Sequence, residues 1–286
     1  MAGWPRLFLL VFGLLVLLVP GPWVARLGAE EKSQPQHAAP LPLSPEESAA
    51  KIRLPDGFRI ELVASEPVVE EPTCIAFDEF GRTFFCELHG FNVEGELDVA
   101  ELNKTGKIDK SVRRIRWERE GGRIAEEAKE LQYGTVKLLT DCDGDGRMDQ
   151  ARVWADRLPP CYGMLPVGGG LIVVCAPEIF FLVDRDGDGK AEVREVLFTG
   201  FRREFIERGI NNPRWCVDNW IYVGSGGDGG TITGPKLKEP VELGRTDFRI
   251  KPNGSAIEPV TGVVRTFGLA LNDIGDRFTA AGGTHC

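Results

Sequence analysis

The sequence has few histidines, no excess of positive charge and no long apolar run. Only three of its 286 residues are histidine, namely His37, His89 and His285, so a three-histidine zinc site would need all of them. The net charge is −9, from 34 Lys and Arg against 43 Asp and Glu. Because a nucleic-acid-binding surface needs basic side chains to neutralise phosphates, we do not expect a nucleic-acid partner. Seven cysteines are too few for a disulfide-built miniprotein.

The longest apolar run is short and lies at the amino terminus. It covers residues 7–19 and follows Arg6. This length suits the core of an export signal better than a membrane span. We interpret residues 1–29 as a signal peptide, cleaved or uncleaved; the alternative is a short amphipathic or core segment. The expected location is the periplasm or cell envelope, and an uncleaved signal would attach the chain to the membrane.

A Pro-rich linker and a β-rich body follow. Residues 30–50 are polar and Pro-rich, with a short helix starting at Ser44-Pro45, and the body covers residues 51–286. In the body, runs of four to eight apolar and β-branched residues between turn signals predict strands. The expected strands are 58–63, 73–77, 83–88, 136–140, 151–155, 171–175, 179–183, 193–198, 213–217, 220–223, 246–250 and 263–270. Residues 92–133 are densely charged, which predicts a solvated surface insertion or a lid.

Similar strand-turn-strand units recur along the body. Their turns lie near residues 81, 169, 218 and 275. Without the charged insertion, the units are spaced by about 50 residues, a period typical of β-propeller blades. The fold class expected is therefore an all-β propeller with about four blades present. The last segment ends soon after a strand begins, so we expect the propeller to be incomplete at the carboxyl terminus.

An acidic motif occurs twice. The first copy carries Asp141, Asp143, Asp145 and Asp149, and the second carries Asp184, Asp186, Asp188 and Glu192. Carboxylates at positions 1, 3, 5 and 9, with Gly at position 6, can surround Ca²⁺. The second copy also has Glu195 at position 12, as an EF-hand loop does. Because both copies lie between expected strands, we predict calcium-binding hairpin loops rather than EF-hands. The alternative is a pair of Asp/Gly turns without metal.

Two cysteines are expected to face each other across the first hairpin. Asp78 to Arg82 suits a three-residue loop with Gly81 in the left-handed conformation. In that register Cys74 lies opposite Cys86, within disulfide reach. Both a bridge and two buried thiols are compatible with the sequence.

The order of these segments resembles the membrane-bound dehydrogenase family of exported bacterial β-propellers. The resemblance is carried by residues 54–64, 75–82, 136–146, 184–189, 194–200 and 212–222. It implies a six-bladed propeller similar to quinoprotein glucose/sorbosone dehydrogenases, a quinone-type cofactor and a sugar or alcohol substrate. Many members carry a haem domain with a Cys-x-x-Cys-His motif, which would accept the electrons. This sequence has no such motif, so haem is not expected in this chain.

Catalytic candidates are weak. The resembling dehydrogenases use a histidine base before the strand that corresponds to residues 213–217, and this sequence has no histidine there. Glu207, His89, Arg214 and Asp228 are candidates for a base or a ligand contact, but each is also compatible with a structural or surface role. Trp215, Trp220 and Tyr222 fit an interior packing role better than a sugar-stacking platform.

Two functions follow from these observations. The first is the amino-terminal propeller part of an exported sugar or alcohol oxidoreductase. The second is a non-catalytic, calcium-stabilised propeller that binds carbohydrate or protein at the cell envelope.

Overall fold

The computed structural model describes residues 43–88, 134–203 and 209–281. Contacts divide the chain into Met1–His37 and Ala38–Cys286, and every described residue lies in the second unit. The predicted signal peptide, the predicted charged insertion and most of the predicted Pro-rich linker therefore lie outside the described residues. In the described part, no helix is long and apolar enough to cross a membrane.

The single helix of the described residues begins where the sequence predicts it. In α1 (Pro45–Lys51) the Ser44 hydroxyl accepts the N–H of Glu47 at 3.1 Å, and the Glu47 carboxylate accepts the N–H of Ser44 at 2.9 Å. This reciprocal pair satisfies two N–H groups at the helix start. None of the helix residues is buried.

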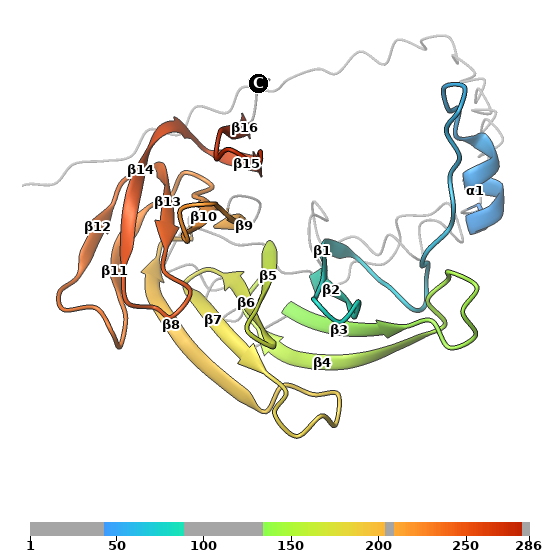
Figure 1. The fold of residues 1–286 in the computed structure, drawn as a ribbon, viewed down its shortest axis with the longest axis horizontal. Coiled ribbons are helices and arrows are strands. Elements are labelled where there is room, and N and C mark those ends of the chain that lie inside the picture. Colours follow the sequence, from blue (N-terminus) through green and yellow to red (C-terminus); the bar gives the residue numbers. More distant parts are fainter. Residues whose placement is uncertain (1–42, 89–133, 204–208, 282–286) are drawn as a thin grey trace, which may run out of the picture. The chain divides into compact units, whose positions relative to one another are not determined.

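The rest of the described chain forms antiparallel sheets, which confirms the all-β class (Figure 1). The first sheet has the order β1-β2-β3-β4, the second β12-β11-β8-β7-β6-β5, and the third β14-β13-β10-β9; β15 and β16 form a separate hairpin. The strands are β1 (Pro72–Phe77), β2 (Thr83–Leu88), β3 (Gly134–Thr140), β4 (Gln150–Leu158), β5 (Gly163–Val167), β6 (Gly170–Cys175), β7 (Glu178–Val183), β8 (Val193–Phe201), β9 (Asn211–Trp215), β10 (Ile221–Gly224), β11 (Gly230–Thr233), β12 (Val241–Leu243), β13 (Thr246–Ile250), β14 (Ile257–Val264), β15 (Thr266–Leu271) and β16 (Arg277–Ala281).

The four repeated turns are the first hairpins of the four sheets. They join β1 to β2, β5 to β6, β9 to β10 and β15 to β16. The first strands contact one another in order, β1 with β5, β5 with β9 and β9 with β15. The approach of β5 to β9 is close: a Cβ added at Gly163 would lie 2.4 Å from Pro213 Cδ. Glycine at position 163 therefore permits the two strands to pack.

Two hydrophobic clusters meet at β6. Its Ile172 and Val174 belong to one cluster, while Leu171, Val173 and Cys175 belong to the other. Because successive strand residues point to opposite faces, both faces of the second sheet are covered at this strand. All six residues of β6 are buried.

Three strand predictions need correction. Residues 58–63 are not a strand, and Phe58 is 72% exposed. The strand expected at 213–217 lies two residues earlier, as β9. The strand expected at 263–270 is two strands, because Arg265 between β14 and β15 adopts a left-handed φ of 62° that extended pairing does not allow. The closure of these sheets into a propeller stays a prediction.

Candidate functional sites

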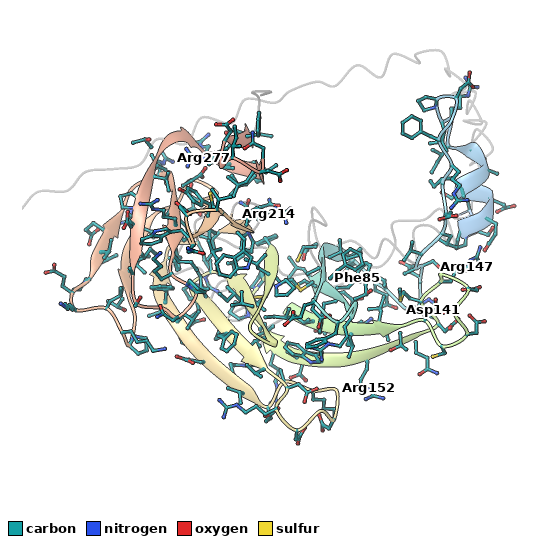
Figure 2. The ribbon with its side chains drawn as sticks, in the orientation of Figure 1. Phe85, Asp141, Arg147, Arg152, Arg214 and Arg277 are labelled. Atoms are coloured by element: carbon teal, nitrogen blue, oxygen red, sulfur yellow. A yellow bond between two sulfur atoms is a disulfide. The ribbon has the colours of Figure 1, made fainter. Side chains whose placement is uncertain are left out.

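The two acidic motifs occupy equivalent places in two sheets. The first lies between β3 and β4 and the second between β7 and β8, which are the third-to-fourth strand connections of the first and second sheets. The prediction of hairpin loops without flanking helices is confirmed. Figure 2 shows Asp141 and Arg147 in the first loop.

Backbone hydrogen bonds orient the carboxylates of the first loop. The two oxygens of Asp141 accept N–H groups from Gly144 at 2.7 Å and Gly146 at 2.9 Å. The carboxylate of Asp149 accepts the N–H of Cys142 at 2.8 Å. Gly144 and Gly146 have φ of 80° and 91°, a region that favours glycine. The hydrogen bonds from Gly146 and Gly144 lower the pKa of Asp141, which keeps it ionised.

The second loop repeats this arrangement. Asp184 accepts N–H groups from Gly187 at 2.7 Å and Gly189 at 3.0 Å. Glu192 takes the place of the last aspartate and accepts the N–H of Arg185 at 3.0 Å. Two loops of different sequence thus adopt one hydrogen-bonding pattern.

Three carboxylates in each loop lie close enough together to contact one cation. Oxygens of Asp141, Asp143 and Asp149 all lie within 4.8 Å of one another, and so do those of Asp184, Asp186 and Glu192. Calcium–oxygen distances are about 2.3–2.6 Å, so two oxygens on one ion are at most about 4.6–5.2 Å apart. This spacing permits the three carboxylates of each loop to share one Ca²⁺.

Three predicted metal residues lie outside these groups. The carboxylates of Asp145 and Asp188 accept the N–H groups of Arg147 at 2.7 Å and Lys190 at 2.8 Å. Glu195 lies in β8 and forms an ion pair with Lys236 at 3.2 Å. The full EF-hand pattern is therefore not assembled, because position 12 belongs to a strand rather than to the loop.

The catalytic candidates do not form a site in the described residues. His89 and Glu207 lie outside them. Arg214, labelled in Figure 2, donates its Nε–H to the carbonyl of Leu269 at 3.1 Å and so joins β9 to β15. Asp228 is buried, with 6% of its surface exposed, in the loop between β10 and β11.

A buried polar network next to that loop was not predicted. The Asp247 carboxylate accepts the N–H of Ser225 at 3.1 Å and the hydroxyl of Thr266 at 2.9 Å. The side-chain amide of Asn211 donates to the carbonyl of Thr266 at 2.8 Å. Ser225 follows β10, the second strand of the third sheet, and Asp247 lies near the start of β13, the third strand in chain order. Asn211 and Thr266 are the first residues of β9 and β15. In an up-and-down sheet these positions lie at the strand ends opposite to the third-to-fourth strand connections, which are the connections that hold the acidic loops.

The aromatic residues of the β9–β10 hairpin are not interior. Trp215 is 42% exposed. Cations cover the Trp220 ring, with Lys251 Nζ 4.1 Å and Arg249 Cζ 4.5 Å from its centroid. The prediction of interior packing is therefore wrong for both tryptophans, and the Trp220 face is occupied by its neighbours.

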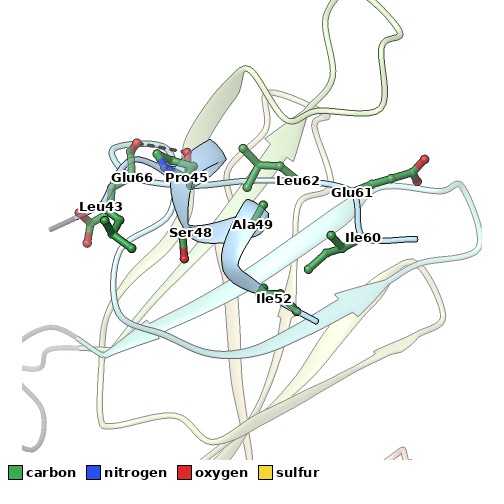
Figure 3. Close-up of a pocket in the computed structure, with 10 residues that line it drawn as sticks. Leu43, Pro45, Ser48, Ala49, Ile52, Ile60, Glu61, Leu62 and Glu66 are labelled. Carbon is green, nitrogen blue, oxygen red and sulfur yellow. Dashed lines mark hydrogen bonds between the residues drawn. The ribbon is translucent and has the colours of Figure 1, made fainter. Parts of the chain in front are cut away.

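A pocket beside α1 is lined mainly by apolar side chains. Figure 3 shows it between the helix and the segment that follows. The lining residues are Leu43, Pro45, Ser48, Ala49, Ile52, Ile60, Glu61, Leu62, Ser65 and Glu66. It contains no cluster of catalytic side chains.

The described residues include a disulfide that the sequence did not indicate. Cys161 and Cys175 are bonded, while Cys74 and Cys86 are free thiols. The predicted register is confirmed, since Cys74 lies opposite Cys86 in the β1–β2 pair. Of the two arrangements that the sequence allowed, the structure has the thiol pair.

A family model described as a domain of unknown function, DUF7133, matches residues 44–286. The chain belongs to this family. No curated protein matches the sequence. A similar solved structure is the extracellular domain of a hybrid two-component system from B. thetaiotaomicron, at 14% identity and a TM-score of 0.28. That match covers 77% of this chain and 32% of the other, and at this score it indicates neither a shared fold nor a shared function.

Proposed function

We propose that this DUF7133 chain is a calcium-stabilised β-propeller domain of an exported protein. The observation that carries the proposal is the pair of acidic loops. They lie at equivalent positions in two sheets, share one hydrogen-bonding pattern and each hold three carboxylates at the spacing of Ca²⁺ ligands. Such carboxylates repel one another unless a cation screens them. Calcium would therefore contribute to stability rather than to chemistry.

Contacts between the sheets support the propeller. In a propeller, the innermost strand of each blade lies next to that of the following blade. The successive contacts of β1, β5, β9 and β15 have this order. The burial of both faces of β6 agrees with a blade between two neighbours.

Binding of a carbohydrate or protein at the cell envelope is the activity that we assign to the domain. The two described catalytic candidates do not form a site for oxidation, because Arg214 hydrogen-bonds a neighbouring strand and Asp228 is buried. The strand ends opposite the acidic loops, which carry the Ser225–Asp247 network, form the proposed ligand-facing surface.

The second candidate is the propeller part of a sugar or alcohol oxidoreductase with a quinone-type cofactor. The order of segments described above favours it, and its electron acceptor would be a haem domain. His89 and Glu207 are then the remaining candidates for a base. Dye-linked oxidation of aldoses or alcohols by the quinone-reconstituted chain would support this candidate, and no turnover is expected under the binding proposal.

Isothermal titration with CaCl₂ tests the calcium proposal directly. Two ions should bind per chain, one for each acidic loop. Asp143→Asn and Asp186→Asn should each remove one site. Asparagine keeps the oxygen that accepts a backbone N–H at these positions while it removes the charge. Asp273→Asn, on an exposed residue of another hairpin, is the control and should leave both sites intact. The absence of binding heat in the unaltered chain at millimolar calcium would refute the proposal.

A further inference from the structure

Two free thiols face each other at the edge of the first sheet. Cys74 in β1 is the direct partner of Cys86 in β2. The N–H of Asp78 donates to the carbonyl of Arg82 at 3.1 Å, which makes residues 78 and 82 a hydrogen-bonded pair. Every second pair has the same character, so residues 74 and 86 are also hydrogen-bonded. The Cα atoms of such a pair are about 5.5 Å apart, inside the disulfide range of roughly 4.4–6.8 Å.

The surroundings of the two thiols differ. Cys74 is half-buried in an edge strand, whereas Cys86 is completely buried in a hydrophobic cluster that also contains the Cys161–Cys175 disulfide. The hydroxyl of Thr73 lies 3.2 Å from the carbonyl of Cys86 and 2.8 Å from that of Cys161. This link fixes the backbone beside the thiol pair.

We propose that Cys74 and Cys86 form a redox-active dithiol, in which Cys74 reacts with a low-molecular-weight disulfide and Cys86 then closes a protein disulfide. The interaction with the Cys86 side chain lowers the pKa of Cys74, and the same interaction together with burial raises the pKa of Cys86. The Cys74 sulfur is therefore the better nucleophile, and the Cys86 sulfur stays protonated until the first has reacted.

The reaction has two exchange steps. The Cys74 thiolate attacks one sulfur of glutathione disulfide, the glutathione S–S bond breaks, and one glutathione leaves as a thiolate that takes up a proton. Cys86 then loses its proton and attacks the Cys74 sulfur, which releases the second glutathione. The two cysteines lose two electrons and two protons, and glutathione disulfide gains both.

Peptide mapping of the full chain tests the proposal. The folded protein is incubated with reduced or oxidised glutathione and quenched with acid; it is then unfolded in guanidinium chloride at near-neutral pH with an excess of a maleimide, which labels every thiol that is still free. In reduced glutathione both Cys74 and Cys86 should be labelled. In oxidised glutathione the two peptides should be joined, with the loss of two hydrogen atoms, and reduced glutathione should reverse the change.

Variants separate the two roles. Cys86→Ser should leave glutathione attached to Cys74, and Cys74→Ser should leave Cys86 unreacted. Cys216→Ser, which removes a thiol in a different hairpin, is the matched control and should not affect the joined peptides. The proposal is wrong if both thiols of the unaltered, folded chain are still labelled in oxidised glutathione. It is also wrong if glutathione persists on Cys74 there, or if either cysteine pairs with Cys161 or Cys175.

Discussion

Calcium should raise the thermal stability of this chain, and neutralising one carboxylate in each loop should remove the effect. The double variant Asp143→Asn/Asp186→Asn changes a residue of each carboxylate group and keeps its loop hydrogen bond. Both loops are exposed at the end of a hairpin, so calcium can reach them in the folded chain. A ligand that binds only the folded state shifts the unfolding equilibrium towards that state.

The size of the effect follows from the affinity expected for such loops. Extracellular calcium sites have Kd values of about 0.1–1 mM. At about 5 mM calcium, one site then stabilises by roughly 1.1–2.3 kcal/mol, and two independent sites by about 2–4.6 kcal/mol. With about 2–4 °C per kcal/mol for a chain of this size, Tm should rise by roughly 4–18 °C.

Differential scanning calorimetry in calcium and in EGTA measures this shift. Asp273→Asn is the control for the loss of a surface charge and should keep the full shift. Magnesium at the same concentration should have a smaller effect, because it requires a near-ideal octahedral site and releases its water reluctantly. If the Tm of the unaltered chain is the same in calcium and EGTA, the two loops are ordinary Asp/Gly turns and the reasoning fails.

Three further predictions concern stability. Lys137→Met should lower the free energy of unfolding by about 3–5 kcal/mol in urea, because Lys137 Nζ lies 2.9 Å from a carboxylate oxygen of the completely buried Glu87. Gly163→Ala should cost about 1–3 kcal/mol by overpacking β5 against β9, whereas Gly244→Ala, with open space at the added Cβ, should stay within about 0.5 kcal/mol. Backbone hydrogen bonds lower the pKa of Asp141, so its contribution is present above the unfolded pKa and is lost as the pH falls through the folded one. The calcium-free chain should therefore lose stability below about pH 4, and Asp141→Asn should weaken this dependence in urea titrations.

Local signals account for the parts of the fold that the sequence predicted. The hairpin at Asp78–Arg82 follows from an Asp and a Gly three residues apart, and the structure has both the turn and the Cys74–Cys86 register. The helix start at Ser44-Pro45 is also encoded within four residues. The strand expected at residues 58–63 is absent, because an alternating pattern forms a strand only where another strand pairs with it. No such pairing exists among the described residues.

The candidate sites show the same difference between features encoded by neighbouring residues and features that depend on distant ones. The acidic loops were predictable because their ligands are close in sequence and their glycines mark the required turns. The Asp247 network was not, because it joins Ser225 and Thr266 from separate segments and neither residue has a characteristic spacing. The β11–β12 pair was also missed, because it lies in the chain between β10 and β13, which pair with each other in the third sheet, while β11 itself pairs with β8 of the second sheet. Insertions of this kind leave no periodic signal.

The two acidic loops contact different neighbours, so they should stabilise different parts of the chain. In the first loop, the N–H of Met148 donates to the carbonyl of Val63 at 2.7 Å, and Arg147 lies 3.7 Å from Glu46 of α1. The first loop therefore holds the amino-terminal segment. In the second loop, Arg152 of β4 donates to the carbonyl of Asp188 at 3.0 Å. The second loop therefore joins the first sheet to the second.

Hydrogen exchange can distinguish these two effects. Calcium should slow amide exchange in both loops of the unaltered chain, because ordered carboxylates hold the loop N–H groups. Asp143→Asn should abolish the slowing in residues 141–149 and in the segment 45–66 that contacts the first loop. Asp186→Asn should abolish it in residues 184–192 and in β4. If each variant instead loses protection equally in both regions, the loops act as one cooperative unit, and the separate roles assigned from their contacts are wrong.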